Sequence, residues 1–160
     1  MARLGNPLVY DLMEVAEALA AQSGRTGVRK AALRRAVSSA YYAVFHALCF
    51  VCASSLVGWS KTALLAPIYR SLDHATAKNR LRSGEANEIG PEILAIGAGF
   101  AQLQEARHLA DYGLPGSPIR HDETMNLIAR ARQIIARIEN LPPEDRLRIA
   151  ILLIARQRPA

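Results

Sequence analysis

The sequence predicts an all-α fold, and three observations support this class. Hydrophobic residues make up 51% of the chain and aromatic residues only 6%, which favours a core of Ala, Leu and Ile between packed helices. Runs that alternate apolar and polar residues, as a half-buried strand requires, are missing. Apolar residues instead recur at spacings of three and four. At 160 residues the chain is long enough for one domain with a real core. We therefore expect an antiparallel bundle of four to five helices plus an extra C-terminal helix.

Start and stop signals predict helices over residues 8–22, 27–56, 61–79, 91–112, 122–139 and 144–156. The first helix follows Asn6 and Pro7, a cap and a proline at the first helical position, and it ends before Gly24. The third contains Pro67, which should kink the helix or mark its true start. Residues 80–90 are polar and are predicted to form a loop.

The later helices have equally plain boundaries. Pro91 opens the fourth helix, in which Gly97 and Gly99 should allow another helix to approach closely. Acidic residues favour the start of the fifth. A proline pair after Leu141 separates the bundle, residues 1–140, from a last helix within residues 141–160. That helix is apolar nearly all round, so we expect it to pack on the bundle or on a dimer mate.

The helix over residues 27–56 carries two stripes at helical spacing. The apolar seam consists of Leu33, Val37, Ala40, Val44, Leu48 and Val51. The polar seam consists of Arg35, Ser39, Tyr42, His46 and Cys49. An ordered polar row on a buried helix either bonds to neighbouring helices or lines a site.

Charge and cysteine usage limit the classes of function. The formal net charge is +6, and 17 of the 20 basic residues are Arg. Arginine suits contacts with phosphate or carboxylate, although the residues are spread along the chain and also fit an arginine-rich genome. Cys49 and Cys52 have no second pair to complete a zinc site, so we expect buried thiols, no metal and no cofactor.

The uncharged stretch over residues 36–60 raises the question of a membrane. Arginines precede it, as they would a membrane-spanning helix. However, it contains five Ser, two Tyr and His46, whose polar positions fall on one stripe. We expect a buried central helix, no membrane and, since no signal peptide is visible, a cytoplasmic protein.

No standard catalytic motif is found, but the end of the fourth helix combines reactive residue types. Arg107 and Asp111 are four residues apart, and an intrahelical ion pair is the simplest explanation for them. His108 and Tyr112 have the same spacing, which also separates Tyr42 from His46. His74 reads as a surface residue.

The two segments over residues 34–47 and 106–112, with their Ala-Tyr-Tyr-Ala-x-Phe-His and Arg-x-x-x-Asp-Tyr motifs, resemble the HEPN superfamily. The similarity covers roughly residues 8–140. It implies a small helical dimer, often paired with a nucleotidyltransferase-type antitoxin. Active members are metal-independent endoribonucleases in which an Arg polarises the scissile phosphate and a His, after four to six intervening residues, moves protons. Arg107 matches that Arg, while Tyr112, Gly113 and Leu114 occupy the His window.

Three functions therefore stay open. The first is binding of nucleotide, RNA or a partner protein at Tyr42, His108, Asp111, Tyr112 and Arg35. The second is RNA cleavage by Arg107 with His46, if His46 faces Arg107 across the bundle. The third is a structural dimerisation or adaptor module whose polar stripes are satisfied hydrogen bonds. A homodimer is also expected from the small residues Ala32, Ala36, Ala40, Ala43 and Ala47 on the second helix.

Overall fold

The computed structural model describes residues 3–60, 62–156 and 158–159. Within these residues it is all-helical and has no strand, so the predicted all-α class is confirmed. The described helices are α1 (Pro7–Ala20), α2 (Thr26–Leu56), α3 (Thr62–Ser71), α4 (His74–Arg80), α5 (Gly84–Ile89), α6 (Pro91–Tyr112), α7 (His121–Glu139) and α8 (Pro143–Ile154).

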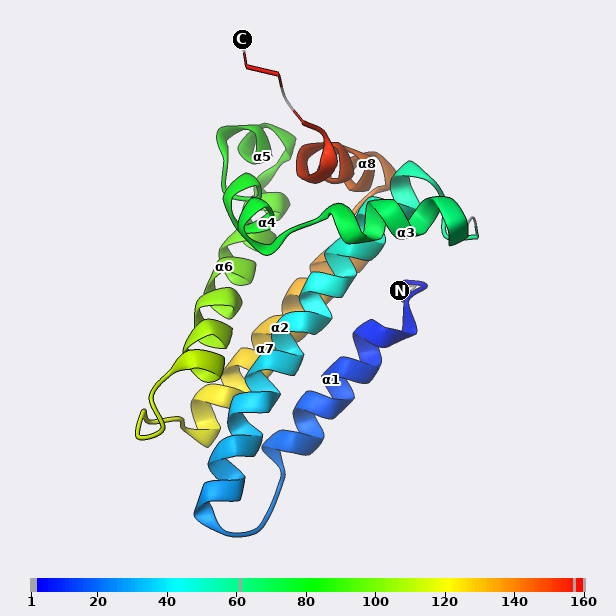
Figure 1. The fold of residues 1–160 in the computed structure, drawn as a ribbon. Coiled ribbons are helices and arrows are strands. Elements are labelled where there is room, and N and C mark those ends of the chain that lie inside the picture. The colour runs from blue at the N-terminus through cyan, green and yellow to red at the C-terminus, as the bar shows by residue number, and fades with distance from the viewer. Residues whose placement is uncertain (1–2, 61, 157, 160) are drawn as a thin grey trace.

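Four long helices form the body of the molecule (Figure 1). α1 and α6 run in one direction, and α2 and α7 run back between them. The short helices α3, α4, α5 and α8 gather at the end where α2 finishes, opposite the α1–α2 loop. α2 contacts α1, α3, α6, α7 and α8, so it is the central element of the fold.

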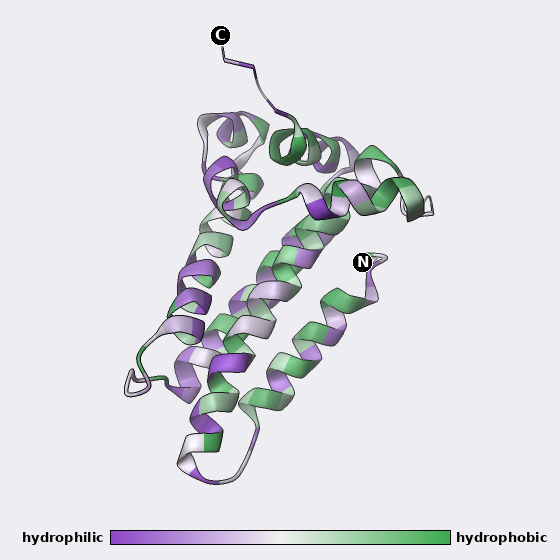
Figure 2. Cartoon of the chain, viewed as in Figure 1, coloured by the Kyte–Doolittle hydropathy of each residue, from purple (hydrophilic) through white to green (hydrophobic). Residues whose placement is uncertain are grey.

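Small side chains explain how so many helices surround α2. Ala36, Ala40, Ala43 and Ala47 are fully buried by helices of the same chain. These alanines therefore serve packing inside the subunit, and they give no support to a dimer contact. α1 and α7, which pack against α2, are amphipathic, as Figure 2 shows for α1, where green and purple alternate along the ribbon.

The region between α2 and α6 departs from the sequence-based boundaries. The predicted third helix is two helices, because Asp73 begins a new one: its carboxylate accepts a hydrogen bond from the Thr76 amide at 2.8 Å. Pro67 lies inside α3 rather than at its start. The predicted loop over residues 80–90 is wrong in part, since it contains α5, capped by the Ser83 hydroxyl and anchored by buried Ala86.

α8 packs on the bundle of its own chain, against α2, α4 and α5. Ile149 and Leu153 are buried, whereas Ile151 is exposed. Arg80 on α4 secures the end of α8 by donating to the carbonyl oxygens of Leu152 and Ala155, each at 2.8 Å.

α2 has the length and composition that would allow a helix to cross a membrane, and it is the one such helix among the described residues. Most of its apolar stretch is covered by the other helices of the bundle.

Candidate functional site

Arg107 on α6 joins the two segments that the sequence singled out. Its Nη1 donates to the Tyr42 hydroxyl at 3.4 Å, and its guanidinium carbon lies 5.2 Å and 5.6 Å from the ring centroids of Tyr41 and Tyr42. The side chain is only 14% exposed. The residues 34–47 and 106–112 are therefore in direct contact within one subunit.

Asp111 balances Arg107 and also holds a second arginine. Its carboxylate lies 3.5 Å from Arg107 Nη1 and 3.7 Å from Arg35 Nη1, and it accepts a hydrogen bond from the Ser38 hydroxyl. The Arg35 side chain is 72% exposed while that of Asp111 is 15% exposed. Because two guanidinium groups share one carboxylate, this group of residues keeps a net positive charge. We call Arg35, Ser38, Tyr42, Arg107 and Asp111 the Arg107 cluster.

Three residues of the Arg107 cluster, namely Arg35, Ser38 and Tyr42, line a groove between α1 and α2. The groove has a volume of about 220 Å³ and is lined by Leu8, Leu12, Arg35, Ser38, Ser39, Tyr42 and His46. Four of the five residues of the predicted polar seam are among them. The seam therefore lines a cavity along most of its length, and only Cys49, which is buried, falls outside it.

His46 lies in this groove but does not contact Arg107. Its Nδ1 is hydrogen-bonded to the hydroxyl of Tyr69 on α3, which in turn accepts from the Asn6 side chain at 3.0 Å. Burial lowers the pKa of His46 and raises the pKa of Tyr69 to about 12. No contact brings His46 to Arg107 among the described residues of this subunit, so the expected His46–Arg107 pair is not formed within one chain.

His74, which the sequence predicts to be a surface residue, packs beside the Arg107 cluster, with its ring centroid 5.9 Å from that of Tyr42. Its Nδ1 is 2.5 Å from the Tyr41 hydroxyl, and its ring centroid is 4.1 Å from that of Phe45. Burial, and then the positive charge of Arg107, lower the pKa of His74, while burial raises that of Tyr41. The Asp73 cap, which starts α4 at His74, is the sequence signal that could have drawn attention to this residue.

Among the described residues, no hydrogen bond or ring contact joins His108 or Tyr112 to the cluster, although His108 lines a second groove together with Arg107. The rings of His108 and Tyr112 contact each other, with centroids 5.0 Å apart, and both side chains are exposed. Of the predicted site residues, Arg35, Tyr42, Arg107 and Asp111 are therefore brought together, and His46 shares their groove. His108 and Tyr112 form a separate surface pair.

The two cysteines are buried and form no disulfide. Burial raises the pKa of Cys49 and of Cys52 to about 12, so both are thiols at neutral pH. In the described ranges, no group of three or more His, Cys, Asp or Glu side chains is arranged to hold a metal ion.

Comparison of the chain with protein-family models, with curated proteins and with solved structures found no match. The class that the structure itself defines is an all-α helical bundle, with a groove between α1 and α2 that Arg35 lines.

Proposed function

We propose that this chain is a HEPN-like helical module that binds RNA, or a nucleotide, through phosphate contacts at the Arg107 cluster. One observation carries the proposal: two guanidinium groups share the single carboxylate of Asp111, and one of them, Arg35, is exposed and lines the groove between α1 and α2. A cluster with surplus positive charge and the hydroxyl group of Tyr42 as a further donor is suited to a phosphate group.

The two arginines have different parts in this proposal. Arg107 is held by Asp111 and by the rings of Tyr41 and Tyr42, so its charge is fixed in position before a ligand arrives. Arg35 is largely exposed and free to turn its guanidinium fork toward a phosphate. The net charge of +6 adds a general attraction for a polyanion.

We favour binding over cleavage because of the histidines. In the HEPN ribonucleases that this chain resembles, a His must reach the same phosphate as the Arg. His46 is instead hydrogen-bonded to Tyr69, and the Nδ1 of His74 is engaged with the Tyr41 hydroxyl. Purified protein should accordingly leave RNA intact, and fragments with 2′,3′-cyclic phosphate ends would favour the endoribonuclease instead.

The test is binding of a fluorescein-labelled single-stranded RNA, followed by fluorescence anisotropy at several salt concentrations. Replacing an arginine that contacts phosphate should weaken binding about tenfold and reduce the salt slope by about one. We expect this result for Arg35→Ala. The control is Arg148→Ala, an exposed arginine on α8 that is paired with Glu144 on the same helix. Equal binding by the two variants would refute the proposal.

A structural role is the second candidate, favoured by the satisfied contacts of Asp111 with Ser38 and Arg107. On this alternative, Arg107→Ala lowers the melting temperature and RNA binding is absent or insensitive to Arg35→Ala. The variant Arg35→Ala distinguishes the two candidate functions. Because Arg35 is exposed, its removal should change stability little, so a loss of RNA binding would reflect a lost contact with RNA.

We also propose that the chain forms a homodimer. We propose in addition that this homodimer binds a nucleotidyltransferase-type antitoxin. The support is an exposed apolar patch at the end of α6, where Leu109, Tyr112 and Leu114 are 69%, 69% and 77% exposed. Light scattering at micromolar concentration should report twice the mass of one chain. Leu109→Glu should shift the protein to a monomer without unfolding it.

A further inference from the structure

A long part of the sequence is positively charged without acidic compensation. Residues 18–72 contain no Asp or Glu but seven Lys or Arg, and five of these fall within residues 25–35. These five cations lie at the start of α2, at the end of the bundle that carries the α1–α2 loop (Figure 1).

Two of these five are engaged with α6. Arg34 donates to the carbonyl oxygens of Ala110, Gly113 and Leu114 at 3.0, 3.3 and 2.9 Å, and Arg35 pairs with Asp111. Arg29 and Lys30, in contrast, have no acidic partner among the described residues, and both are exposed.

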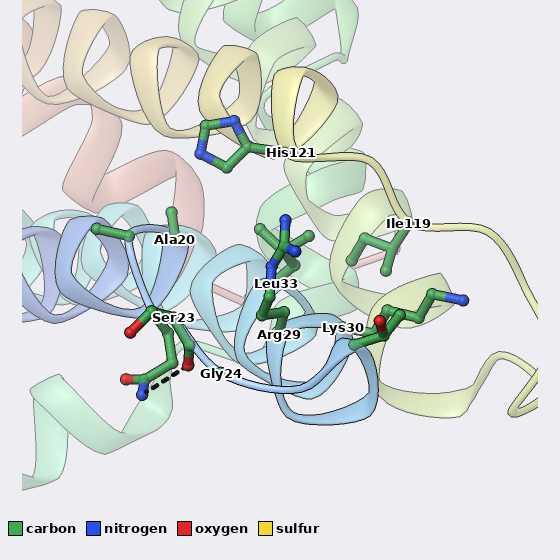
Figure 3. Close-up of a pocket in the computed structure, with 11 residues that line it drawn as sticks. Ala20, Ser23, Gly24, Arg29, Lys30, Leu33, Ile119 and His121 are labelled. Carbon is green, nitrogen blue, oxygen red and sulfur yellow. Dashed lines mark hydrogen bonds between the residues drawn. The ribbon is translucent and has the colours of Figure 1, made fainter.

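Arg29 and Lys30 line a cavity of about 530 Å³ (Figure 3). Its floor is Leu33, its rim is the α1–α2 loop with Ser23 and Gly24, and its far wall is formed by Ile119 and His121 at the start of α7. Figure 3 shows the cationic side chains of α2 on one side of the cavity and the His121 imidazole on the other. The lining includes no Asp or Glu.

The backbone adds to this positive field. α2 begins in the wall of the cavity at Thr26, with no side-chain cap and no acidic residue in its first turn, so its first amide groups are not neutralised. Asp122 and Glu123 at the start of α7 do not line the cavity, and both pair with Arg120, at 3.1 Å and 4.0 Å.

We propose that this cavity binds a phosphate group, either that of a small phosphorylated molecule or the terminal phosphate of a nucleic acid. Arg29 and Lys30 supply the charge, and the His121 ring and the first amides of α2 supply further hydrogen-bond donors. The volume of about 530 Å³ lies within the range usual for small-molecule sites.

This site is independent of the Arg107 cluster. At about 100° per residue, Arg29, Lys30 and Leu33 lie on the face of α2 opposite to Arg35 and Tyr42. The two proposals therefore fail or succeed separately: Arg35→Ala should leave phosphate binding at this cavity unchanged.

The test uses pyrophosphate and the full-length protein. Titration followed by ¹H–¹⁵N NMR should shift the amide signals of residues 26–30, and calorimetry should give the affinity. Arg29→Ala with Lys30→Ala should weaken that affinity by at least about tenfold. The control, Arg82→Ala with Arg156→Ala, removes two exposed cations near α5 and α8 and should bind as the wild type does.

Two oligonucleotides distinguish the sources of the phosphate. If an RNA with a 5′-phosphate binds more tightly than its 5′-hydroxyl form, and the Arg29/Lys30 variant loses the difference, the ligand is a nucleic-acid end. If the two RNAs bind equally while pyrophosphate binding depends on Arg29 and Lys30, the ligand is a small molecule. Equal pyrophosphate affinity in the site variant and the control variant, or unshifted amide signals at millimolar pyrophosphate, would overturn the proposal.

Discussion

Gly97 marks the closest approach of α6 to the chain that follows α4. A Cβ atom built at Gly97 would lie 2.4 Å from the carbonyl oxygen of Leu81 and 2.8 Å from its carbonyl carbon. These are backbone atoms, so they cannot turn aside as the end of a side chain can. Leu81 is itself fully buried, and it directly follows the helix that carries His74. Gly97→Ala should therefore push α4 away from α6.

The expected cost follows from two opposing effects. Alanine in the interior of a helix is better than glycine by about 1 kcal/mol. Overpacking costs about 1–3 kcal/mol, and a clash with backbone belongs at the upper end of that range. The net loss in the free energy of unfolding should thus be about 1–2 kcal/mol, which for a chain of this size lowers the melting temperature by about 2–8 °C.

Gly99→Ala is the matched control on the same helix. Its Cβ atom would meet Cδ1 and Cγ1 of Ile134, at 2.6 Å and 2.9 Å, and a side chain on α7 can change its rotamer. The gain in helix propensity should then offset most of the strain, leaving stability within about 1 kcal/mol of the wild type. Urea and thermal denaturation of both variants would measure the difference. A Gly97→Ala protein that melts at or above the wild-type temperature would refute the steric argument.

Three further predictions concern buried polar groups. Since burial lowers the pKa of His46 and His74 below the ordinary 6.5, the unfolded chain binds protons more readily. The contribution of the two neutral histidines to the free energy of unfolding should therefore be fully present above pH 6.5 and be lost as the pH falls below it. In urea titrations at several pH values, the variant with His46→Gln and His74→Gln should show a flatter dependence of this free energy on pH. The thiols of Cys49 and Cys52, whose pKa values are about 12, should react with a thiol reagent only after denaturation; rapid reaction of the native protein would contradict their burial. Arg34→Met should increase hydrogen exchange in the loop after α6, whose carbonyl groups Arg34 binds, while exchange in α1 stays unchanged.

The long helices could be predicted from the sequence because their boundaries carry local signals. Asn6 caps α1, Pro91 starts α6, and the acidic residues at the start of α7 mark its first turn. Local signals did not distinguish α4 from α3, or α5 from a loop. The buried residue of α4 is Ala77 and that of α5 is Ala86, so neither helix has the repeated apolar residues that would predict it.

The candidate site could be predicted where the position of a side chain depends only on the face of its own helix. The spacing of residues on two long helices indicates Tyr42 and Arg107, and the structure brings these two side chains into contact. His74 could not be selected in this way. It reaches Tyr41 because a new helix begins after Asp73 and packs against α6 and α8, and this depends on packing between segments 33 residues apart.

The uncharged middle of α2 has a physical explanation in these contacts. Ser38, Tyr41 and His46 are hydrogen-bonded to side chains of three different elements, namely α6, α4 and α3. A charged residue at any of these positions would have to be desolvated inside the bundle, whereas a neutral hydroxyl or imidazole loses little once it is paired. These three side chains can therefore fix the positions of α6, α4 and α3 without a charged group of their own. In this region full charge is carried by Arg35, Arg107 and Asp111, and of these the exposed Arg35 lines the groove, where a phosphate could reach it.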